Sequence, residues 1–202
     1  MMAGHLPQAG LPVLRGKPPL HSLLHSPRIA SPSRYVIFVR VFPTVFCRAL
    51  SEPRHIMRIA VISDTHDECP RRLAAKLRGA DEIWHLGDVM DTRILADFEK
   101  LGVPLKVILG NCDHHLEWPE SLSLDREGVL CHLVHIPPRK APGGIQLLLH
   151  GHTHIPRDYT DALGVRWLNP GSPSCPRGGF PPSFAWLEIV KGQVLGWTLV
   201  RV

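Results

Sequence analysis

Five short polar segments of this chain carry side chains that can bind metal ions, and each follows an apolar, strand-like run. They are Asp64-Thr65-His66, Gly87-Asp88, Gly110-Asn111-Cys112-Asp113, His135 and Gly151-His152-Thr153-His154. Carboxylates, amide oxygens and imidazoles together suit borderline divalent ions such as Mn, Fe, Co, Ni or Zn. Each segment alone is weak evidence, because polar residues commonly occupy turns. All five in this order predict a metal centre.

The elements that must position these segments alternate between strands and helices in the first part of the chain. Strands are expected at 57–62, 82–86 and 105–109, and helices at about 70–78 and 92–101. Gly102 follows the second helix, as glycine often does past a helix end. This alternation indicates βαβ units and a parallel sheet.

Parallel strands place their carboxyl ends at one edge of the sheet, where ligand sites form. The ligands that follow the first three strands are therefore expected in one crevice, namely Asp64, His66, Asp88 and Asn111. Residues two apart on extended backbone point the same way, so His152 and His154 would present a second pair to one site, as Asp64 and His66 do. Glycines at 87, 110 and 151 would let backbone approach the site closely.

The second half of the chain is rich in strands. Apolar runs occur at 129–136, 145–149, 163–168, 184–190 and 194–200. Between the first two runs, three prolines and two glycines within 137–144 disfavour a helix. We expect these runs to form a second sheet packed on the first. The fold class is therefore α/β, with two packed β-sheets flanked by helices.

Residues 1–56 differ from the rest of the chain. They contain eight prolines, seven of the 23 Lys and Arg residues, and one of the 18 acidic residues, Glu52. We interpret 1–56 as an extension outside the fold and 57–202 as the domain. The extension has two explanations that stay open. Either the reading frame extends upstream of a true start at Met57, or the segment is an organellar transit peptide, which is typically rich in Arg and poor in acids.

Composition excludes several function classes. The net charge of +5 comes from the extension, so a basic nucleic-acid-binding surface is not indicated for 57–202. No apolar run reaches the roughly 18 residues that a membrane-spanning helix needs. The five cysteines include no C-x-x-C pair, which favours a reducing, cytoplasmic location.

Several motifs together resemble those of the calcineurin-like metallophosphoesterases, in particular the small single-domain phosphodiesterases of bacteria and archaea. The matching segments are Ser63-Asp64-Thr65-His66, Leu86-Gly87-Asp88, Gly110-Asn111-Cys112-Asp113, Gly151-His152-Thr153-His154 and Asn169-Pro170-Gly171-Ser172. The resemblance extends from Met57 to the last residue. It implies a four-layer sandwich of two mixed sheets between helices. A retromer subunit with this fold is a non-enzymatic relative.

The resemblance also implies a ligand set for two divalent ions. One ion would be held by Asp64, His66 and His154, the other by Asn111, His135 and His152, with Asp88 bridging both. Manganese is the first choice of metal, and Ni, Zn, Fe and Co are alternatives. The family usually has glycine after the histidine where this chain has Ile136, and His132 is the fallback for His135.

The activity implied is phosphodiester hydrolysis by a hydroxide that bridges two metals about 3.5–4 Å apart. Asp88, Asn111 and Cys112 are the expected catalytic residues. Many relatives have histidine in place of Cys112, and a thiol donates protons poorly and carries no positive charge. A diesterase is therefore expected rather than a monoesterase. Arg177 and His114 are candidate substrate-binding residues.

The expected partner is a small-molecule or nucleotide-type phosphodiester, with nucleic acid only as a substrate and no membrane partner. An exposed sheet edge would permit an oligomer. Two alternatives remain, a non-catalytic scaffold with this fold and a phosphomonoesterase. The complete set of seven ligands favours the enzyme, because a scaffold is free to lose them.

Overall fold

The computed structural model describes residues 55–67, 69–114 and 117–202. Residues 1–54 of the expected extension lie outside the described residues, so the domain boundary at Met57 stays a prediction. Within the described ranges, no helix has the length and apolar character needed to cross a membrane.

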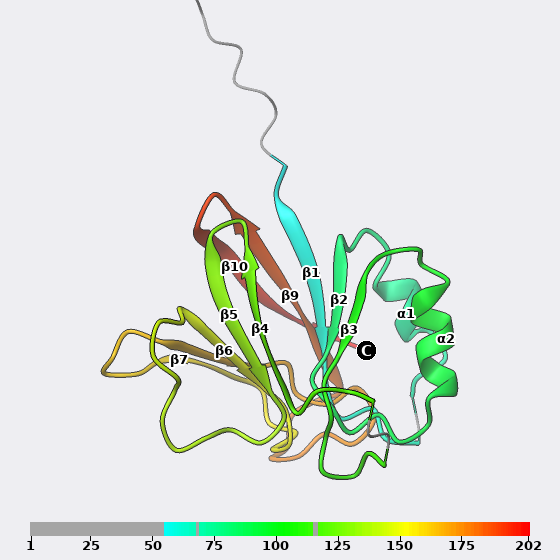
Figure 1. Cartoon of the computed structure of the whole chain (residues 1–202). Helices are drawn as coiled ribbons and strands as arrows, with labels where there is room; N and C mark the ends of the chain where they lie inside the picture. The colour runs from blue at the N-terminus through cyan, green and yellow to red at the C-terminus, as the bar shows by residue number, and fades with distance from the viewer. Residues whose placement is uncertain (1–54, 68, 115–116) are drawn as a thin grey trace, which may run out of the picture. The chain divides into compact units, whose positions relative to one another are not determined.

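Ten strands and two helices make up the described part of the chain (Figure 1). In chain order they are β1 (Met57–Ile62), α1 (Leu73–Lys76), β2 (Glu82–His85), α2 (Arg93–Glu99), β3 (Leu105–Val107), β4 (Ser121–Arg126), β5 (Val129–Val134), β6 (Leu147–His150), β7 (Arg157–Thr160), β8 (Arg166–Asn169), β9 (Ser183–Val190) and β10 (Gln193–Arg201).

The strands form two mixed sheets of five strands each. The first sheet has the order β10-β9-β1-β2-β3. Strands β1, β2 and β3 are parallel to one another, and β9 is antiparallel to both of its neighbours, β1 and β10. The second has the order β4-β5-β6-β8-β7, with a parallel centre and two antiparallel edges. The expectation that β9 and β10 belong to the second sheet was wrong. Seven of the eight β9 residues are buried, which an interior position between β1 and β10 provides.

Alternate residues of β1 serve two different cores. Ile59 and Val61 face the second sheet and pack in one cluster with residues such as Leu133. Ala60 and Ile62 point the other way and pack in a cluster that includes Leu73 and Phe98 of the helices. Because successive side chains of a strand point to opposite faces, a strand covered on both sides is apolar throughout.

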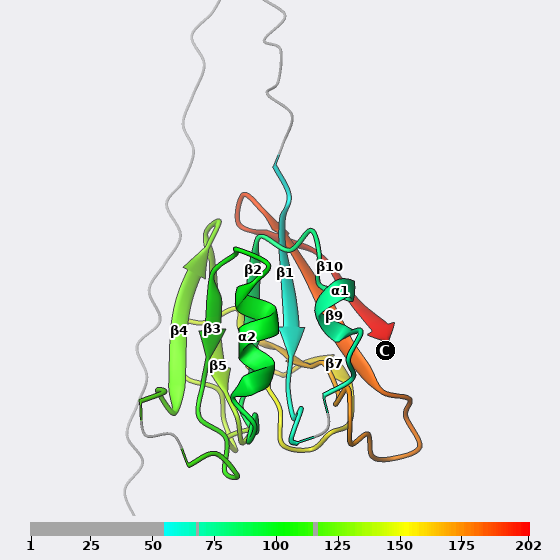
Figure 2. The ribbon, with the colours of Figure 1, turned by 90° about the vertical axis from the view of Figure 1, so that its right-hand side faces the viewer.

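Helices cover only one of the two sheets among the described residues. Both α1 and α2 pack on the outer face of the first sheet, as Figures 1 and 2 show. The outer face of the second sheet carries a small cluster of Ala141, Leu148, Val165 and Trp167. Ala141 belongs to the β5–β6 loop, residues 135–146, which contains no helix, as its prolines and glycines predicted. The layer beyond the second sheet is therefore a loop.

Three elements differ from the sequence-based expectation. Strands β4 and β7 were not predicted, because β4 alternates exposed and half-buried residues and all four residues of β7 are exposed. Their strand pairing comes from the neighbours β5 and β8. Helix α1 covers only Leu73–Lys76, less than the expected 70–78. Helix α2 ends just before Gly102, whose φ of 73° fits the predicted helix end.

Candidate metal centre

The predicted ligands gather where the parallel strands end. Asp64 and His66 follow β1, Asp88 follows β2, and Asn111 lies in the loop after β3. In the second sheet, His135 follows β5 directly, and the Gly151–His154 loop follows β6. These ends meet at the lower end of the molecule in Figure 1. The predicted ligands are therefore gathered at one end of the domain, and loops of both sheets contribute them.

A first ligand group, Asp64, His66, Asp88 and His154, offers one ligand atom per residue, all within 4.8 Å of one another. A carboxylate oxygen of Asp64 is 3.2 Å from Nε2 of His154. Nε2 of His154 is 3.3 Å from Nε2 of His66, which is 4.0 Å from Oδ2 of Asp88. Two carboxylates and two imidazoles at this spacing fit a borderline divalent ion.

The other three predicted ligands, Asn111, His135 and His152, lie together beside the first group and are called the second ligand group here. The amide oxygen of Asn111 is 3.0 Å from Nε2 of His135 and 2.8 Å from Nδ1 of His152. Nε2 of His135 is also 3.3 Å from Oδ2 of Asp88. The same carboxylate oxygen of Asp88 thus faces both groups.

The ligand backbone is not extended, contrary to the expectation for the two i, i+2 pairs. Five predicted ligands have left-handed conformations, with φ of 56° at Asp64, 46° at His66, 56° at Asp88, 65° at His152 and 57° at His154. Such conformations are uncommon for residues other than glycine and cluster at functional sites. As a consequence His152 and His154 do not share one group, since His152 contacts Asn111 and His154 contacts Asp64.

Two glycines allow these loops to come together, as expected. A Cβ atom on Gly110 would lie 2.1 Å from the backbone nitrogen of Asp88. A Cβ atom on Gly151 would lie 1.9 Å from Oγ of Ser63. Any larger residue at either position would push apart loops that carry ligands.

Asp113 holds the Asp88 turn in place, a role that the sequence analysis missed. Its carboxylate accepts hydrogen bonds from the backbone N–H groups of Asp88, Val89, Met90 and Gly110, at 2.8–2.9 Å. A second acid close behind Asn111 was the available signal. The carbonyl of Asp64 is fixed in a similar way, by the hydroxyls of Ser172 and Ser174. Ser172 belongs to the late Asn-Pro-Gly-Ser segment, which therefore lies beside the site.

Hydrogen bonds on the outer side orient the imidazoles. Nδ1 of His135 donates to the carbonyl of Leu86 at 2.7 Å, and Nδ1 of His154 donates to the carbonyl of Cys175 at 2.5 Å. Each bond leaves Nε2 as the nitrogen that faces the site. Metal-binding histidines commonly have such an outer partner, which selects the tautomer and fixes the ring.

Charge pairing within the site changes several pKa values. Burial raises the pKa of Asp88, but hydrogen bonds from His135 and from the Cys112 N–H outweigh it and hold the carboxyl well below its usual range. The hydrogen bond to Asp64 raises the pKa of His154 against the effect of burial. Burial lowers the pKa of His135, but Asp88 and Asp64 reverse this and raise it. The Asp88 carboxyl is therefore ionised, as a metal ligand must be.

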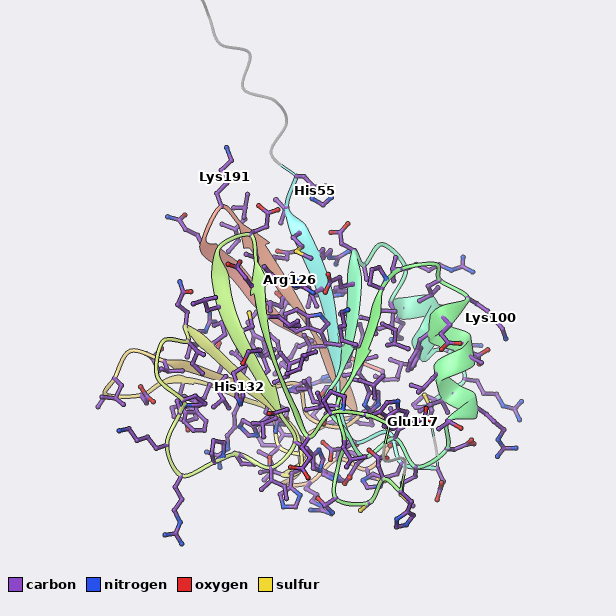
Figure 3. The ribbon with its side chains drawn as sticks, viewed as in Figure 1. His55, Lys100, Glu117, Arg126, His132 and Lys191 are labelled. Atoms are coloured by element: carbon purple, nitrogen blue, oxygen red, sulfur yellow. The ribbon has the colours of Figure 1, made fainter. Side chains whose placement is uncertain are left out.

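The other candidate residues fall into two classes. Cys112 donates its backbone N–H to Oδ1 of Asp88 at 2.8 Å, and the backbone N–H of Arg177 donates to the carbonyl of His154 at 3.3 Å, so both adjoin the site. His114 is exposed, and among the described residues it forms no hydrogen bond or ion pair with the predicted ligands. His132 lies on β5 and contacts Ser123 at 2.9 Å, away from the loops (Figure 3), so the fallback is not needed.

Comparisons with known proteins agree with this arrangement. The family model of the calcineurin-like phosphoesterase superfamily domain matches residues 57–192. The Thermotoga maritima protein TM1076 is 30% identical, with a TM-score of 0.55 over 72% of this chain and 99% of its own. Yfce, a phosphoesterase from E. coli, is 23% identical, with a TM-score of 0.58 over 70% of this chain and 98% of its own.

The chain is also similar in structure to a protein whose name does not describe it as a phosphoesterase. Vps29 from Entamoeba histolytica, solved with Zn²⁺, is 20% identical, with a TM-score of 0.58 over 72% of this chain and 98% of its own. No curated protein matches the chain in sequence. The family model covers the whole ligand set and about two thirds of the sequence, from Met57 onward. The chain belongs to the calcineurin-like phosphoesterase superfamily.

Proposed function

We propose that this protein is a phosphodiesterase that depends on two divalent metal ions, with Mn²⁺ as the first choice. The position of Asp88 carries the proposal, because its Oδ2 atom faces His66 of the first ligand group and His135 of the second. One ion would be held by Asp64, His66, His154 and Asp88. The other would be held by Asn111, His135, His152 and Asp88.

Two divalent ions at such a site supply charge neutralisation for the phosphoryl group and an activated water near neutral pH. The protein's own residues provide positioning. Asp88 is 2% exposed, and its carboxylate accepts a hydrogen bond from the backbone N–H of Cys112. The backbone N–H of Asp88 donates in turn to the carboxylate of Asp113. Asp64 is fully buried, and its carboxylate accepts the backbone N–H of His152 at 3.1–3.2 Å. Groups fixed before the substrate arrives need no reorganisation during the reaction.

Cys112 supports the choice of a diester over a monoester. Partial burial and the neighbouring Asp88 raise the pKa of its thiol, so the side chain stays neutral. Nδ2 of Asn111 lies 3.2 Å from the sulfur. A neutral thiol next to the site provides no positive charge for the dianion of a phosphomonoester, whereas a diester carries a single negative charge.

The surroundings of the second ligand group also suit an organic ester. A hollow of about 370 Å³ adjoins Asn111 and His135. Its other lining residues are mostly apolar and comprise Leu109, Gly110, Glu120, Val134 and Ile136. Ile136 is 50% exposed and replaces the glycine that is usual in the family. We propose that this side chain contacts an apolar part of the substrate.

The test measures hydrolysis of bis(p-nitrophenyl) phosphate and p-nitrophenyl phosphate by the full chain. The protein is stripped with a chelator and then supplied with Mn²⁺, Ni²⁺, Zn²⁺ or Mg²⁺ in turn. We expect a metal to restore cleavage of the diester, with the monoester cleaved more slowly. Asp88→Asn should lack the activity, and Asp97→Asn, an exposed acid on α2, should keep it.

The results separate the enzyme from its alternatives. Faster cleavage of the monoester would favour a phosphomonoesterase. No turnover by a folded protein with any metal would overturn the proposal in favour of a non-catalytic scaffold. The number of ions is measured independently by metal analysis, and a single ion at saturation would contradict the dinuclear site.

A further inference from the structure

A large hollow lies on the outer face of the second sheet, between the β5–β6 loop and the β7–β8 hairpin. Its volume is about 580 Å³. It occurs where helices are absent among the described residues and a loop covers the sheet instead. Thr153 lines it, and Thr153 stands between His152 and His154 of the two ligand groups. A residue that lines the hollow is therefore the direct sequence neighbour of one histidine from each ligand group.

Three cations line the hollow, Arg139 and Lys140 from the loop and Arg157 from β7. All three are exposed, and within the described ranges none forms an ion pair with a carboxylate. By contrast, Arg166 on the neighbouring strand is paired with Asp158 at 2.7 Å. Within the described part of the chain, these three positive charges are thus not neutralised by an ion pair.

Asp161 is the single carboxylate among the described residues that line the hollow, and both of its oxygens already accept hydrogen bonds within the protein. One oxygen accepts the indole N–H of Trp167 at 2.9 Å, and the other accepts the backbone N–H groups of Leu163 and Val165. These bonds hold the turn between β7 and β8. Asp161 therefore stabilises the wall of the hollow and leaves the three cations to a ligand.

An aromatic ring faces the same hollow. Tyr159 and Trp167 are paired directly across β7 and β8, and their rings stack with centroids 5.8 Å apart at an angle of 15°. Tyr159 is nonetheless 44% exposed, so much of its ring remains accessible. Arg157 lies two residues away on β7, and alternate residues share one face of a strand, so the cation and the ring stand side by side.

We propose that this hollow binds the part of a nucleotide-type substrate that is remote from the scissile ester. The cations would hold a second phosphate group, and Tyr159 would stack on a base. Arginine and lysine form charge-assisted hydrogen bonds with phosphate, and aromatic rings stack on any base. The inference rests on the proposed function, since it places the scissile diester at the metal centre. The substrate class is then a phosphodiester with a nucleobase and at least one further phosphate.

The test uses two dinucleotides, pTpT and TpT, which differ only in a terminal phosphate. Their dissociation constants for the metal-free full chain are measured by calorimetry in the presence of a chelator, so no turnover takes place. We expect pTpT to bind about tenfold more tightly, since one charge-assisted hydrogen bond contributes that much. Arg157→Gln, or independently Arg139→Gln, should remove most of this preference.

Two further variants complete the experiment. Tyr159→Ala should weaken both dinucleotides about tenfold, as loss of base stacking does. Lys191→Gln removes a cation from the β9–β10 turn, at the end of the molecule opposite the metal centre (Figure 3), and should bind both as the unchanged protein does. Equal affinity for pTpT and TpT, or a preference that survives both arginine substitutions in folded protein, would overturn the proposal.

A third arm identifies the source of the nucleotide. A single strand of about ten thymidines that binds no better than pTpT identifies a small nucleotide, and much tighter binding identifies a nucleic-acid strand. Failure of the two proposals can be told apart. A preference for pTpT without metal-dependent cleavage of bis(p-nitrophenyl) phosphate would retain the hollow and reject the enzyme, and the reverse result would reject only the hollow.

Discussion

Charged side chains have different surroundings at the metal centre and on the outer face of the second sheet. At the metal centre, Asp64 and Asp88 are buried, and both oxygens of each carboxylate have partners. On the outer face, Arg139, Lys140 and Arg157 are exposed and unpaired within the described ranges. Fixed groups suit a reaction common to many substrates, and unpaired cations suit the recognition of one class. We infer that chemistry and specificity reside in separate regions.

The largest effect is expected from breaking the link between the two ligand groups. Asp88→Asn removes the carboxylate charge whose Oδ2 atom lies near both His66 and His135. Since bound metals supply several kcal/mol of transition-state stabilisation, the rate of diester hydrolysis should fall about 1000-fold. Metal content, measured by elemental analysis, should fall with it. A variant that retains two ions and most of its activity would contradict the bridging role.

The two regions should also differ in their tolerance of added volume. A Cβ atom at Gly110 would lie 2.1 Å from the backbone nitrogen of Asp88, whereas at Gly143, in the β5–β6 loop, nothing lies within 4 Å. Gly110→Ala should lower the free energy of unfolding by about 3 kcal/mol, in the range of overpacked sites. Gly143→Ala should raise it by about 0.5 kcal/mol through reduced entropy of the unfolded chain.

Urea unfolding of both glycine variants, without metal, measures this difference. If Gly110→Ala is as stable as Gly143→Ala, the close approach of the Gly110 loop to Asp88 is not required by the fold.

The buried imidazole of His85, close to the metal centre, should make the free energy of unfolding depend on pH. His85 is fully buried, Nε2 contacts Thr65 Oγ1 at 3.0 Å, and burial lowers the pKa of His85 to about 4. Below about pH 6.5 His85 binds a proton in the unfolded chain but not in the folded chain. The free energy of unfolding therefore decreases as the pH is lowered from about 6.5 to about 4. Between about pH 6.5 and 5, the contribution of His85 is about 2 kcal/mol.

Unfolding of the metal-free protein at several pH values checks this contribution. His85→Gln should lose about 2 kcal/mol of the pH dependence, and His114→Gln, an exposed control, should keep it. The same slope in all three proteins would show that folding does not lower the pKa of His85.

The smallest effect is expected from the outer partner of one imidazole. Nδ1 of His66 lies 3.1 Å from the sulfur of Met90, whose φ is 57°. Met90→Leu removes this contact and should weaken metal binding about tenfold, as loss of outer partners does. Met57→Leu, a core substitution on β1, is the matched control. Competition with a chelating dye measures both affinities, and equal values would show that Met90 does not orient His66.

Most of the predicted site residues could be found from the sequence, because ligand types and the apolar runs before them are visible as local residue patterns. The apolar run at 57–62 corresponds to β1, and the ligands that follow it were located by their order along the chain. The strand β7 escaped prediction because its four residues are all exposed and carry no apolar pattern. The role of Asp113 escaped it for a different reason. The acid is visible in the sequence, but its partners are backbone N–H groups, which residue types do not identify.

By itself, the sequence determined the two-sheet α/β class, the chemistry of the ligands and the superfamily to which the chain belongs. Only the tertiary structure decided that β9 and β10 join the first sheet, that five of the predicted ligands have left-handed backbone conformations, and that a cationic hollow lies beside them. The physical reason is range. Side-chain periodicity and turn chemistry act between near neighbours, whereas strand partners and backbone conformation at a packed site are set by contacts between residues far apart in the chain.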